Sequence, residues 1–476
     1  STRVRSSAAS DVYKRQGLIH KDGDIMVKDL TTGSPAKLIL MFTLPLIVGN
    51  VFQQLYLLSD TLIVGRLLGV SALAAVGCSG CLMFFMIGFV IGFTAGLSIC
   101  TGQRFGAKDE EGMKKSAAAC VVLSAITTVI VTIFGVIMVR PALIFLQTPP
   151  EVLDMACTFL TVIFLGIVAT MMFNMSSNLI RALGDSKTPL YFLILGCVLN
   201  IILEVVFIGV FNWGIQGAGF ATVLAQLING GCCVYYIKKK IPLLHFELKD
   251  LKISREIAIQ HLKVALPMGF QASIIAIGAI ILQVPLNNLG EVAVAAYAAA
   301  QKIDMIAVMP LMSFGMAMAA YTAQNYGAGR MDRIKTGVNK CILMSGGFSI
   351  LAGMINICLG PILIRLFVGD GQEQVVEYGH IYLIVNGSCY LILSLLFIYR
   401  YTLQGLGQSI IPTFAGIMEL VMRAAAGLFL VDAFGYIGAC WANPMAWIGS
   451  CVPLMIAFYI TRKSLLKKYY EHKLSV

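Results

Sequence analysis

Long apolar runs separated by short polar segments fill this chain from about residue 38 to residue 460. A helix needs about 20 mostly apolar residues to cross a bilayer. By that rule the sequence predicts twelve spans, and the predicted fold class is an all-α polytopic membrane protein. The predicted spans are about 38–64, 72–102, 117–139, 152–180, 189–210, 216–237, 263–288, 292–322, 338–366, 376–403, 411–431 and 436–460.

The first predicted span carries polar residues within its apolar stretch. Gln53, Tyr56 and Asp60 are spaced by three and four residues, so they share one face of a helix. A carboxylate inside a span is costly, and it usually faces the bundle interior or a water-filled cavity. The alternative is an acid solvated by headgroups at the membrane edge. We interpret Asp60 as a buried functional residue.

Composition agrees with a membrane protein and excludes several other classes. Hydrophobic residues make up 58% of the 476 residues and charged residues only 12%, whereas soluble domains average about 45–50% and about 25%. The net charge of +11 does not indicate a nucleic-acid partner, because the basic residues lie between the spans. The 13 cysteines lie mostly within apolar runs, and we interpret even the Cys78–Cys81 CxxC as packing residues.

The distribution of Lys and Arg predicts the orientation in the membrane. Most of the 35 basic residues lie in the N-terminal segment, the even-numbered connections and the tail, and Arg400 is counted with them at the end of the tenth span. Only Arg66, Arg140 and Arg365 fall in connections on the other side. The positive-inside rule then places both termini in the cytoplasm. We expect a multi-pass protein of the cell (inner) membrane.

Short motifs recur at an offset of 221 to 223 residues, so nearly the whole chain is two copies of one unit. Six spans per copy make both copies enter the membrane from the same side. This is the parallel-repeat plan of transporters, whose site lies in a cavity between or within the halves. The recurring pairs are Leu44-Pro45 and Leu266-Pro267, Gln103–Ala107 and Gln324–Ala328, Leu183-Gly184 and Leu406-Gly407, and Gly217-Ala218 and Gly438-Ala439.

The repeat also predicts the domain organisation. Residues 1–35 form an N-terminal segment, and its first sixteen residues, STRVRSSAASDVYKRQ, are expected to be non-native because their composition differs from that of the rest of the chain. The remaining predicted units are an N-lobe at 36–237, a cytoplasmic linker at 238–262, a C-lobe at 263–460 and a cytoplasmic tail at 461–476.

Six longer motifs occur in order along the chain: QQLYLLSDTLIVGRLLGVSALAAVG, GQRFGAKD, RALGDSKTP, LNIILEVVFIG, GIQGAGFAT and QGLGQSIIPTFAGIMELVMR. With the twelve spans and the two copies, these motifs resemble the multidrug and toxic compound extrusion (MATE) transporters over roughly residues 35–460. The resemblance is greatest to the bacterial branch that carries its cation site in the N-terminal lobe. It implies a V-shaped pair of six-helix lobes that expels organic cations in exchange for H⁺ or Na⁺.

The resemblance also implies the residues of the cation site. The family's first-span acid corresponds to Asp60, and its span-five pair corresponds to Asn200 and Glu204. Its span-six threonine corresponds to Thr222, and an asparagine near the end of span four corresponds to Asn178. Independently, Asn200 and Glu204 are four residues apart and share a helix face. Carboxylate, amide and hydroxyl oxygens suit Na⁺, and two close carboxylates favour holding H⁺. Interhelical hydrogen bonding is the alternative for the neutral residues, and an interfacial acid is the alternative for Glu204.

Two features depart from the family pattern. Glu204 stands where Asp is usual in this branch, so the choice of ion stays open. The seventh span has no acid and offers only amides such as Gln271 and Gln283, so coupling through that span is not expected. The second copy also has Leu282 where Asp60 would repeat, which predicts cation binding in one lobe only.

Further polar residues within spans are candidates for a substrate cavity. Glu419 and Arg423 lie four residues apart on span eleven, and we interpret them as an ion pair within the bundle. The alternative is that Glu419 attracts a cationic drug while Arg423 steadies it. The other candidates are Gln53, Tyr56, Gln271 and Gln283.

Two further features are interpreted as structural. Lys302 and Asp304, near the start of span eight, are expected to form an interfacial pair. The recurring segments Gln103–Gly106 and Gln324–Gly327 are explained as helix ends.

These observations predict a secondary antiporter and not an enzyme. No GxxxxGK[ST] string occurs, so ATP is not expected to drive the protein directly, and no catalytic or metal-ligand spacing stands out among the five histidines. We expect no cofactor beyond the coupling ion, organic cations and membrane lipid as partners, no nucleic acid, and a monomer. One alternative is a flippase for a lipid-linked glycan precursor, which needs basic residues in central spans where only Lys302 and Arg423 are available. A passive channel is disfavoured by the duplicated plan.

Overall fold

The computed structural model describes residues 28–369 and 371–474, and this part of the chain is helical without strands. The sixteen residues expected to be non-native lie outside the described residues. The first copy of the repeat forms α2 (Pro35–Leu68), α3 (Val70–Gly106), α4 (Glu110–Phe145), α5 (Pro150–Leu165), α6 (Ile167–Ala182), α7 (Lys187–Glu204) and α8 (Ile215–Lys240). The second forms α9 (Arg255–Asn287), α10 (Glu291–Gly327), α11 (Met331–Val368), α12 (Glu373–Ser388), α13 (Tyr390–Gly405), α14 (Ile410–Ala425), α15 (Val431–Phe434) and α16 (Tyr436–Leu474).

The number of spans agrees with the hydropathy pattern. Within the described residues, 10 helices are long and apolar enough to cross a membrane, and two bent helix pairs raise the total to up to 12. The α5–α6 pair bends by 46° and the α12–α13 pair by 49°. The first bend falls at Gly166, where an added Cβ would lie 2.1 Å from a methyl group of Val223. Close packing of α8 against this turn therefore requires glycine, and hydropathy alone does not predict the bend.

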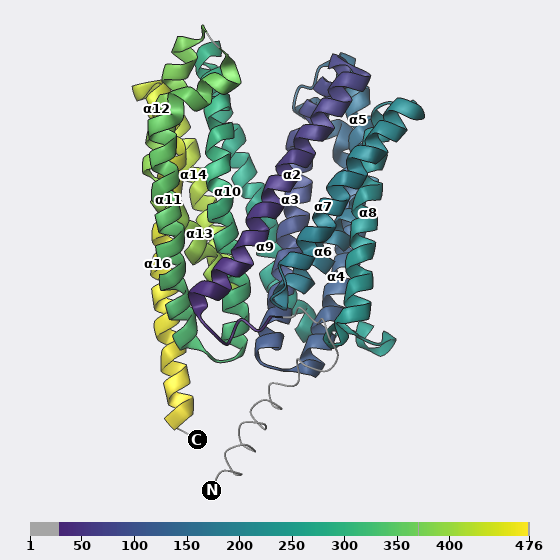
Figure 1. Cartoon of the computed structure of the whole chain (residues 1–476), viewed down its shortest axis with the longest axis vertical. Helices are drawn as coiled ribbons and strands as arrows, with labels where there is room; N and C mark the ends of the chain where they lie inside the picture. Colours follow the sequence, from purple (N-terminus) through teal and green to yellow (C-terminus); the bar gives the residue numbers. More distant parts are fainter. Residues whose placement is uncertain (1–27, 370, 475–476) are drawn as a thin grey trace, which may run out of the picture.

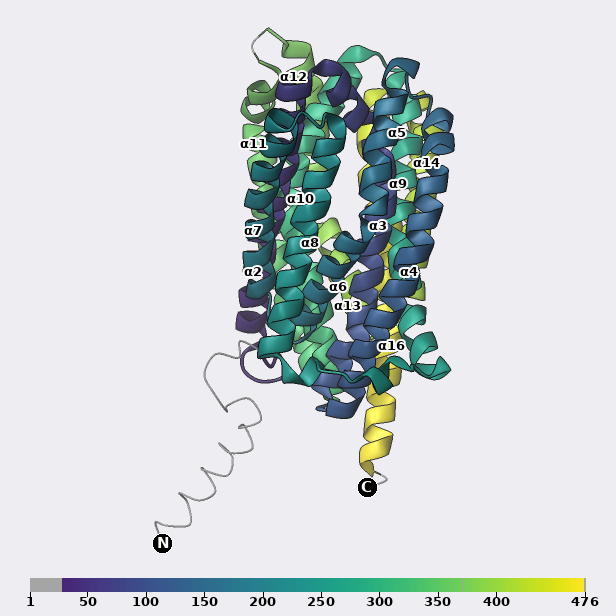
Figure 2. The ribbon, with the colours of Figure 1, turned by 90° about the vertical axis from the view of Figure 1, so that its right-hand side faces the viewer.

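The helices form two lobes arranged as a V, as predicted. Figure 1 shows α3 to α8 on one side and α10 to α16 on the other, with α2 crossing from the foot of the second group to the first, and the ribbons diverge toward the end that carries α5 and the start of α12. The turned view of Figure 2 shows the same helices running nearly parallel to the long axis. We call the converging end, where the turns after α3, α6, α10 and α13 lie, the closed end.

The first helix of each copy packs against the opposite lobe near the closed end. Leu38 and Phe42 of α2 belong to a core cluster built mainly from α10, α11, α13 and α16. Further along α2, the Asn50 side-chain amide donates to the Ser313 hydroxyl of α10 at 2.9 Å. In the same way, Ala265 of α9 belongs to the core of the first lobe, and the ring of His261 contacts the Ser116 hydroxyl at 2.8 Å. Each lobe is therefore held at the closed end by a helix of the other copy.

The two glutamine motifs join the lobes at the closed end. Gln103 at the end of α3 donates its side-chain amide to the backbone oxygen of Gly405, the last residue of α13, at 2.9 Å. Gln324 of α10 donates to the backbone oxygen of Ala182, the last residue of α6, at 2.8 Å. The two bonds are related by the sequence repeat and cross between the lobes in opposite directions. These motifs do end their helices, but that explanation is incomplete because they also connect the lobes.

Glycine at the end of each motif allows the two backbones to approach. A Cβ added at Gly106 would lie 1.9 Å from the backbone oxygen of Gln324. One added at Gly327 would lie 1.8 Å from the backbone oxygen of Gln103. We call the two cross-lobe bonds and these two glycine contacts the latch.

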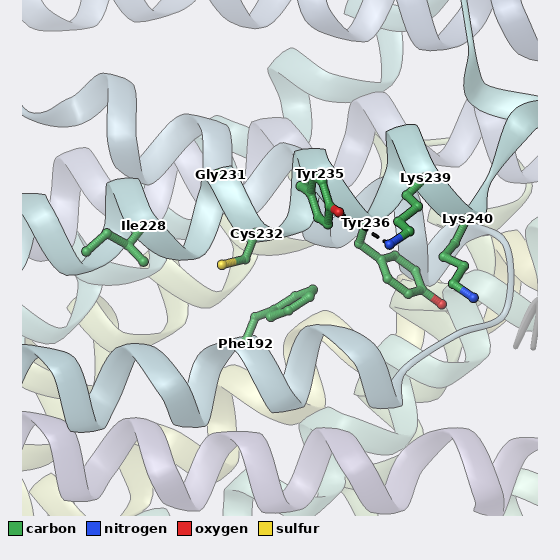
Figure 3. Close-up of a pocket in the computed structure, with 8 residues that line it drawn as sticks. All are labelled: Phe192, Ile228, Gly231, Cys232, Tyr235, Tyr236, Lys239 and Lys240. Atoms are coloured by element: carbon green, nitrogen blue, oxygen red, sulfur yellow. Dashed lines mark hydrogen bonds between the residues drawn. The ribbon is translucent and has the colours of Figure 1, made fainter.

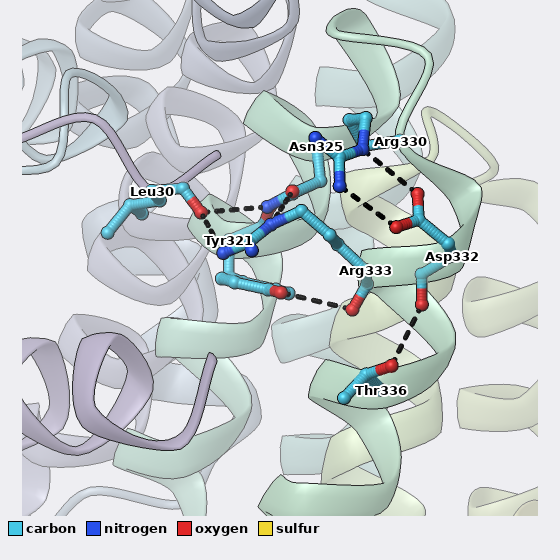
Figure 4. A network of polar contacts seen from close by, with 7 residues as sticks. All are labelled: Leu30, Tyr321, Asn325, Arg330, Asp332, Arg333 and Thr336. Carbon is cyan, nitrogen blue, oxygen red and sulfur yellow. Dashed lines mark hydrogen bonds and ion pairs between the residues drawn. The ribbon is translucent and has the colours of Figure 1, made fainter. Parts of the chain in front are cut away.

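The segment before α2 runs across the latch. The Leu30 backbone donates to the Gln324 side-chain oxygen at 2.9 Å and accepts from the Asn325 amide at 3.2 Å. Figure 4 shows the polar network around this residue, which links it to the start of α11. Two residues earlier, the Lys28 backbone donates to the Leu183 backbone oxygen of the first lobe at 3.2 Å. Residues 28–30 thus contact both lobes at the closed end.

Candidate functional site

Three helices of the first lobe bring the predicted cation-site residues together. Tyr56 and Asp60 lie on α2, Asn200 and Glu204 on α7, and Thr222 on α8. Asn200 and Glu204 have no exposed surface. Because these two residues are one helical turn apart, α7 presents both to the polar face of α2.

Thr222 links the neutral members of the group. Its hydroxyl oxygen accepts a hydrogen bond from the Tyr56 hydroxyl at 3.1 Å. It also accepts from the side-chain amide of Asn200 at 3.4 Å. The three helices are therefore connected through one hydroxyl group, which fixes the Asn200 amide with its nitrogen toward α8 and leaves its oxygen available.

The two acidic residues of the group, Asp60 and Glu204, face each other, and no hydrogen-bond donor is paired with their buried oxygens. The Asp60 and Glu204 carboxyl groups are neighbours. Both Glu204 oxygens, one Asp60 oxygen and the Asn200 side-chain oxygen are buried and accept no hydrogen bond. Two adjacent carboxylates repel unless a proton or a cation lies between them. All of these potential ligand atoms are oxygens, which suit H⁺ or a hard cation such as Na⁺.

The backbone changes at the acid on α7. Glu204 is the last α-helical residue before a π-helical segment, Val205–Val210. Such π segments are rare and are frequent at functional sites. The second copy has a corresponding π segment at Ala426–Leu430, where alanine stands in place of the acid. The repeat has therefore kept the backbone distortion in both lobes but has the acid in only one.

Several predicted residues lie away from this group. Asn178 of α6 donates to the Thr94 hydroxyl at 3.1 Å and accepts from Arg181, so its hydrogen bonds do not reach the α2–α7–α8 group. Gln53 is exposed on α2. Gln271 of α9 is buried and accepts from the Gln404 amide at 2.8 Å, which makes it a contact between helices.

A cluster of three charges lies inside the C-lobe. Arg400 of α13 pairs with Glu419 of α14, and both side chains are at least 95% buried. Arg423 lies 3.9 Å from the second Glu419 oxygen. The predicted Glu419–Arg423 pair is thus present, but Arg400 is the nearer partner. Arg400 was counted with the cytoplasmic-side basic residues at the end of the tenth span, and hydropathy counting cannot show that its side chain is buried inside the lobe.

Removal of the shared carboxylate should destabilise this lobe. We expect Glu419→Gln to cost about 3–5 kcal/mol, because it leaves two buried guanidinium groups without a counter-charge. Thermal unfolding of the purified protein in detergent measures the loss. The Arg400→Met/Glu419→Met double variant should lose less than the sum of the two single changes. Equal stability of Glu419→Gln and the unmodified protein would contradict this role.

A further acid, Asp304, is buried, although the sequence predicted it to be interfacial. Asp304 of α10 accepts hydrogen bonds from the hydroxyls of Tyr390 at 2.5 Å and Tyr382 at 3.4 Å. The predicted interfacial pair with Lys302 is wrong, because Asp304 is buried whereas Lys302 is exposed. The two tyrosines come from α12 and α13, about 80 residues further along the chain, so no local pattern indicates them.

Each lobe has a cavity among its described residues. A cavity of about 390 Å³ is formed by α9, α10, α14 and α16 with Phe84 of α3, and Gln283 and Arg423 line it. A second, of about 510 Å³, lies between α7 and the later part of α8 (Figure 3). Its walls are Phe192 and residues from Ile228 to Lys240, and none of the predicted site residues lines it. We call the cavity of about 390 Å³ that Gln283 and Arg423 line the C-lobe cavity.

Comparison with known proteins agrees with the internal repeat. The family model described as MatE matches the chain twice, over residues 45–206 and 267–428. The chain belongs to the MATE family.

Relatives of this MATE protein match most of its length. The "Probable multidrug resistance protein YpnP" of Bacillus subtilis is 31% identical over 355 residues, which are 75% of this chain and 79% of the relative. The "Probable multidrug resistance protein NorM" of Thermotoga maritima is 24% identical and covers 90% of this chain and 92% of its own. A structure titled "Crystal structure of MATE in the bent conformation" has a TM-score of 0.86 at 23% identity, over 94% of this chain and all of that one. This last similarity shows the fold alone.

Proposed function

We propose that this MATE protein exports amphiphilic organic cations in exchange for H⁺ or Na⁺, and that Asp60 and Glu204 bind the coupling ion. The observation that carries the proposal is the set of buried acceptor oxygens on α2 and α7 that have no donor. A proton or Na⁺ between the two carboxyl groups would remove their repulsion and draw α2 toward α7. Because α2 also packs on the C-lobe, such a movement changes how the lobes meet at the closed end.

The ion acts through its unequal affinity for two arrangements of the lobes. With the acids apart, the ion loses one of its carboxylate partners and binds more weakly. With the acids together, it binds tightly and stabilises the arrangement in which α2 follows α7. Export then requires that the cargo and the ion favour different arrangements, so that each displaces the other.

We further propose that the closed end faces the cytoplasm of a cell (inner) membrane. Basic residues gather there, in the turns and helix ends that include Arg104, Lys108, Arg330, Arg333 and Lys335. The positive-inside rule supports this orientation. The V then opens toward the outside, where the cargo is released.

A direct test uses purified protein in liposomes loaded with a fluorescent organic cation. Imposing a Na⁺ gradient and a pH gradient in separate experiments identifies the coupling ion. We expect one or both gradients to drive loss of dye well above protein-free liposomes. Dye flux that is equal with and without either gradient would overturn the antiport proposal and favour a passive pathway.

The flippase alternative gains one observation, because Arg400 joins Arg423 as a buried basic residue, although Lys302 is exposed. Glu419 compensates one of these charges, however, and the remaining excess is small for a pyrophosphate group. Transfer of a lipid-linked glycan analogue between leaflets, with no ion-driven dye export by the same preparation, would favour this alternative.

A further inference from the structure

The C-lobe cavity has a cationic group in an otherwise apolar and amide lining. Its apolar walls include Phe84 and Tyr297, and its neutral polar groups include Gln301 and Asn443. Arg423 is the charged residue of this lining. A cavity of this kind, apolar with a few placed polar groups, is typical of a small-molecule site.

Arg423 is incompletely satisfied within the protein. Only 8% of the residue is exposed, and its Nε has no hydrogen-bond partner. One Nη atom donates to the Ile275 backbone oxygen at 3.3 Å, and the other lies 3.9 Å from Glu419, too far for a strong charge-assisted bond. A guanidinium group offers five N–H donors, so Arg423 has donors available for a ligand.

The charges around Arg423 leave an excess of one positive charge. Glu419 is held by Arg400 in the closer of its two ion pairs. Asp304 does not line the cavity, since its oxygens accept from the hydroxyls of Tyr382 and Tyr390. The charged cluster therefore consists of the guanidinium groups of Arg400 and Arg423 and the carboxylate of Glu419, and Arg423 is its member that lines the cavity.

The charged clusters inside the two lobes have opposite sign. The first lobe gathers two acids without a cation, at Asp60 and Glu204, whereas the second lobe gathers two arginines around one acid. The offset of 223 residues between Leu183-Gly184 and Leu406-Gly407 places the neutral Asn200 of the first lobe where Arg423 stands in the second, so this positive group has no charged counterpart. The two lobes are thus suited to different ligands.

We propose that Arg423 is a subsite for a carboxylate of the cargo, so that the preferred substrate is a cationic amphiphile that also bears an acidic group. The inference rests on the proposed export function and names the substrate class more closely. The planar guanidinium fork matches a carboxylate in two parallel hydrogen bonds. The aromatic and aliphatic walls of the cavity receive the apolar body of the ligand, and its cationic part faces the acidic first lobe.

The test compares two dyes that differ by one negative charge: a rhodamine with a free carboxylate and the ethyl ester of the same rhodamine. Binding to the purified protein in lipid nanodiscs is measured by fluorescence anisotropy, with no ion gradient present. We expect the unmodified protein to bind the free acid about tenfold more tightly than the ester. Arg423→Gln should abolish this preference by weakening acid binding alone, and Arg423→Lys should keep part of it.

Control measurements distinguish a failure of the carboxylate-subsite proposal from a failure of the export proposal. Arg140→Gln removes an exposed arginine outside the cavity and should leave both affinities unchanged. Equal affinity for acid and ester in the unmodified protein, binding of neither dye, or equal loss of both in Arg423→Gln would each overturn the carboxylate subsite. The comparison within the unmodified protein needs no variant to fold. If the acid is preferred but no gradient drives its export, the subsite stands and the export proposal fails.

Discussion

Asp60→Asn is expected to reduce ion-driven dye export to the level of protein-free liposomes while the protein still folds. The amide keeps the shape of the carboxyl group but carries no charge and supplies only one acceptor oxygen. The carboxyl of Glu204 then no longer faces a second acid, so the pair can neither share a proton nor hold Na⁺ between two carboxylates. The measurement is dye efflux from liposomes under each gradient.

The matched control is Asp154→Asn on α5, because it makes the same chemical change at an exposed ion pair with Arg140. Its export should equal that of the unmodified protein. Dye binding without a gradient should persist in Asp60→Asn, which separates loss of coupling from loss of folding. Normal gradient-driven export by Asp60→Asn would contradict the assignment of the N-lobe acids.

Glu204→Asp provides a further comparison at the same site. The shorter side chain restores the acid that is usual in this branch of the family, but it withdraws the carboxyl group from Asp60. We therefore expect a change in the relative effectiveness of the Na⁺ and pH gradients rather than complete loss of export.

The second large effect is expected at the latch. Gly106→Ala adds a methyl group at a position where its carbon would lie 1.9 Å from a backbone oxygen of α10. Neither backbone can yield without separating α3 from α10. Overpacking of this kind costs about 1–3 kcal/mol per site, and about 1.4 kcal/mol changes a two-state equilibrium tenfold. The closed end should therefore open, and export should fall strongly.

Folding should survive this change, because alanine is favoured over glycine within a helix by about 1 kcal/mol. Hydrogen–deuterium exchange of residues 28–34 and of the ends of α3 and α10 should increase, since these backbones are protected by contacts across the latch. Gly327→Ala should act in the same way through the repeat-related contact. Gly77→Ala, on the same helix with no atom within 4 Å of the added carbon, is the control. Unchanged export and exchange in Gly106→Ala would show that the latch does not govern closure.

Hydropathy and recurring motifs were enough to predict the membrane fold and its internal repeat. An apolar run long enough to cross a bilayer must satisfy its backbone groups internally, so hydropathy predicts helices with little ambiguity. The constant offset between motifs predicted the two lobes, and i,i+4 spacing placed Asn200 and Glu204 on one face. Asp60 was indicated by its cost within an apolar span.

The contacts between residues far apart in the chain could be identified only in the folded protein. Arg400 and Glu419 are 19 residues apart on different helices, and Gln103 meets Gly405 across 302 residues. Asn178 was matched to the cation site by its position in the chain, yet its hydrogen bonds go to Thr94 and Arg181. Periodicity constrains which residues share a face of one helix, but the rotation and crossing of two helices depend on side-chain packing along their whole length. For that reason the sequence indicated the acids of the first lobe as candidates, whereas the latch and the charged cluster beside the C-lobe cavity became visible only in the folded chain.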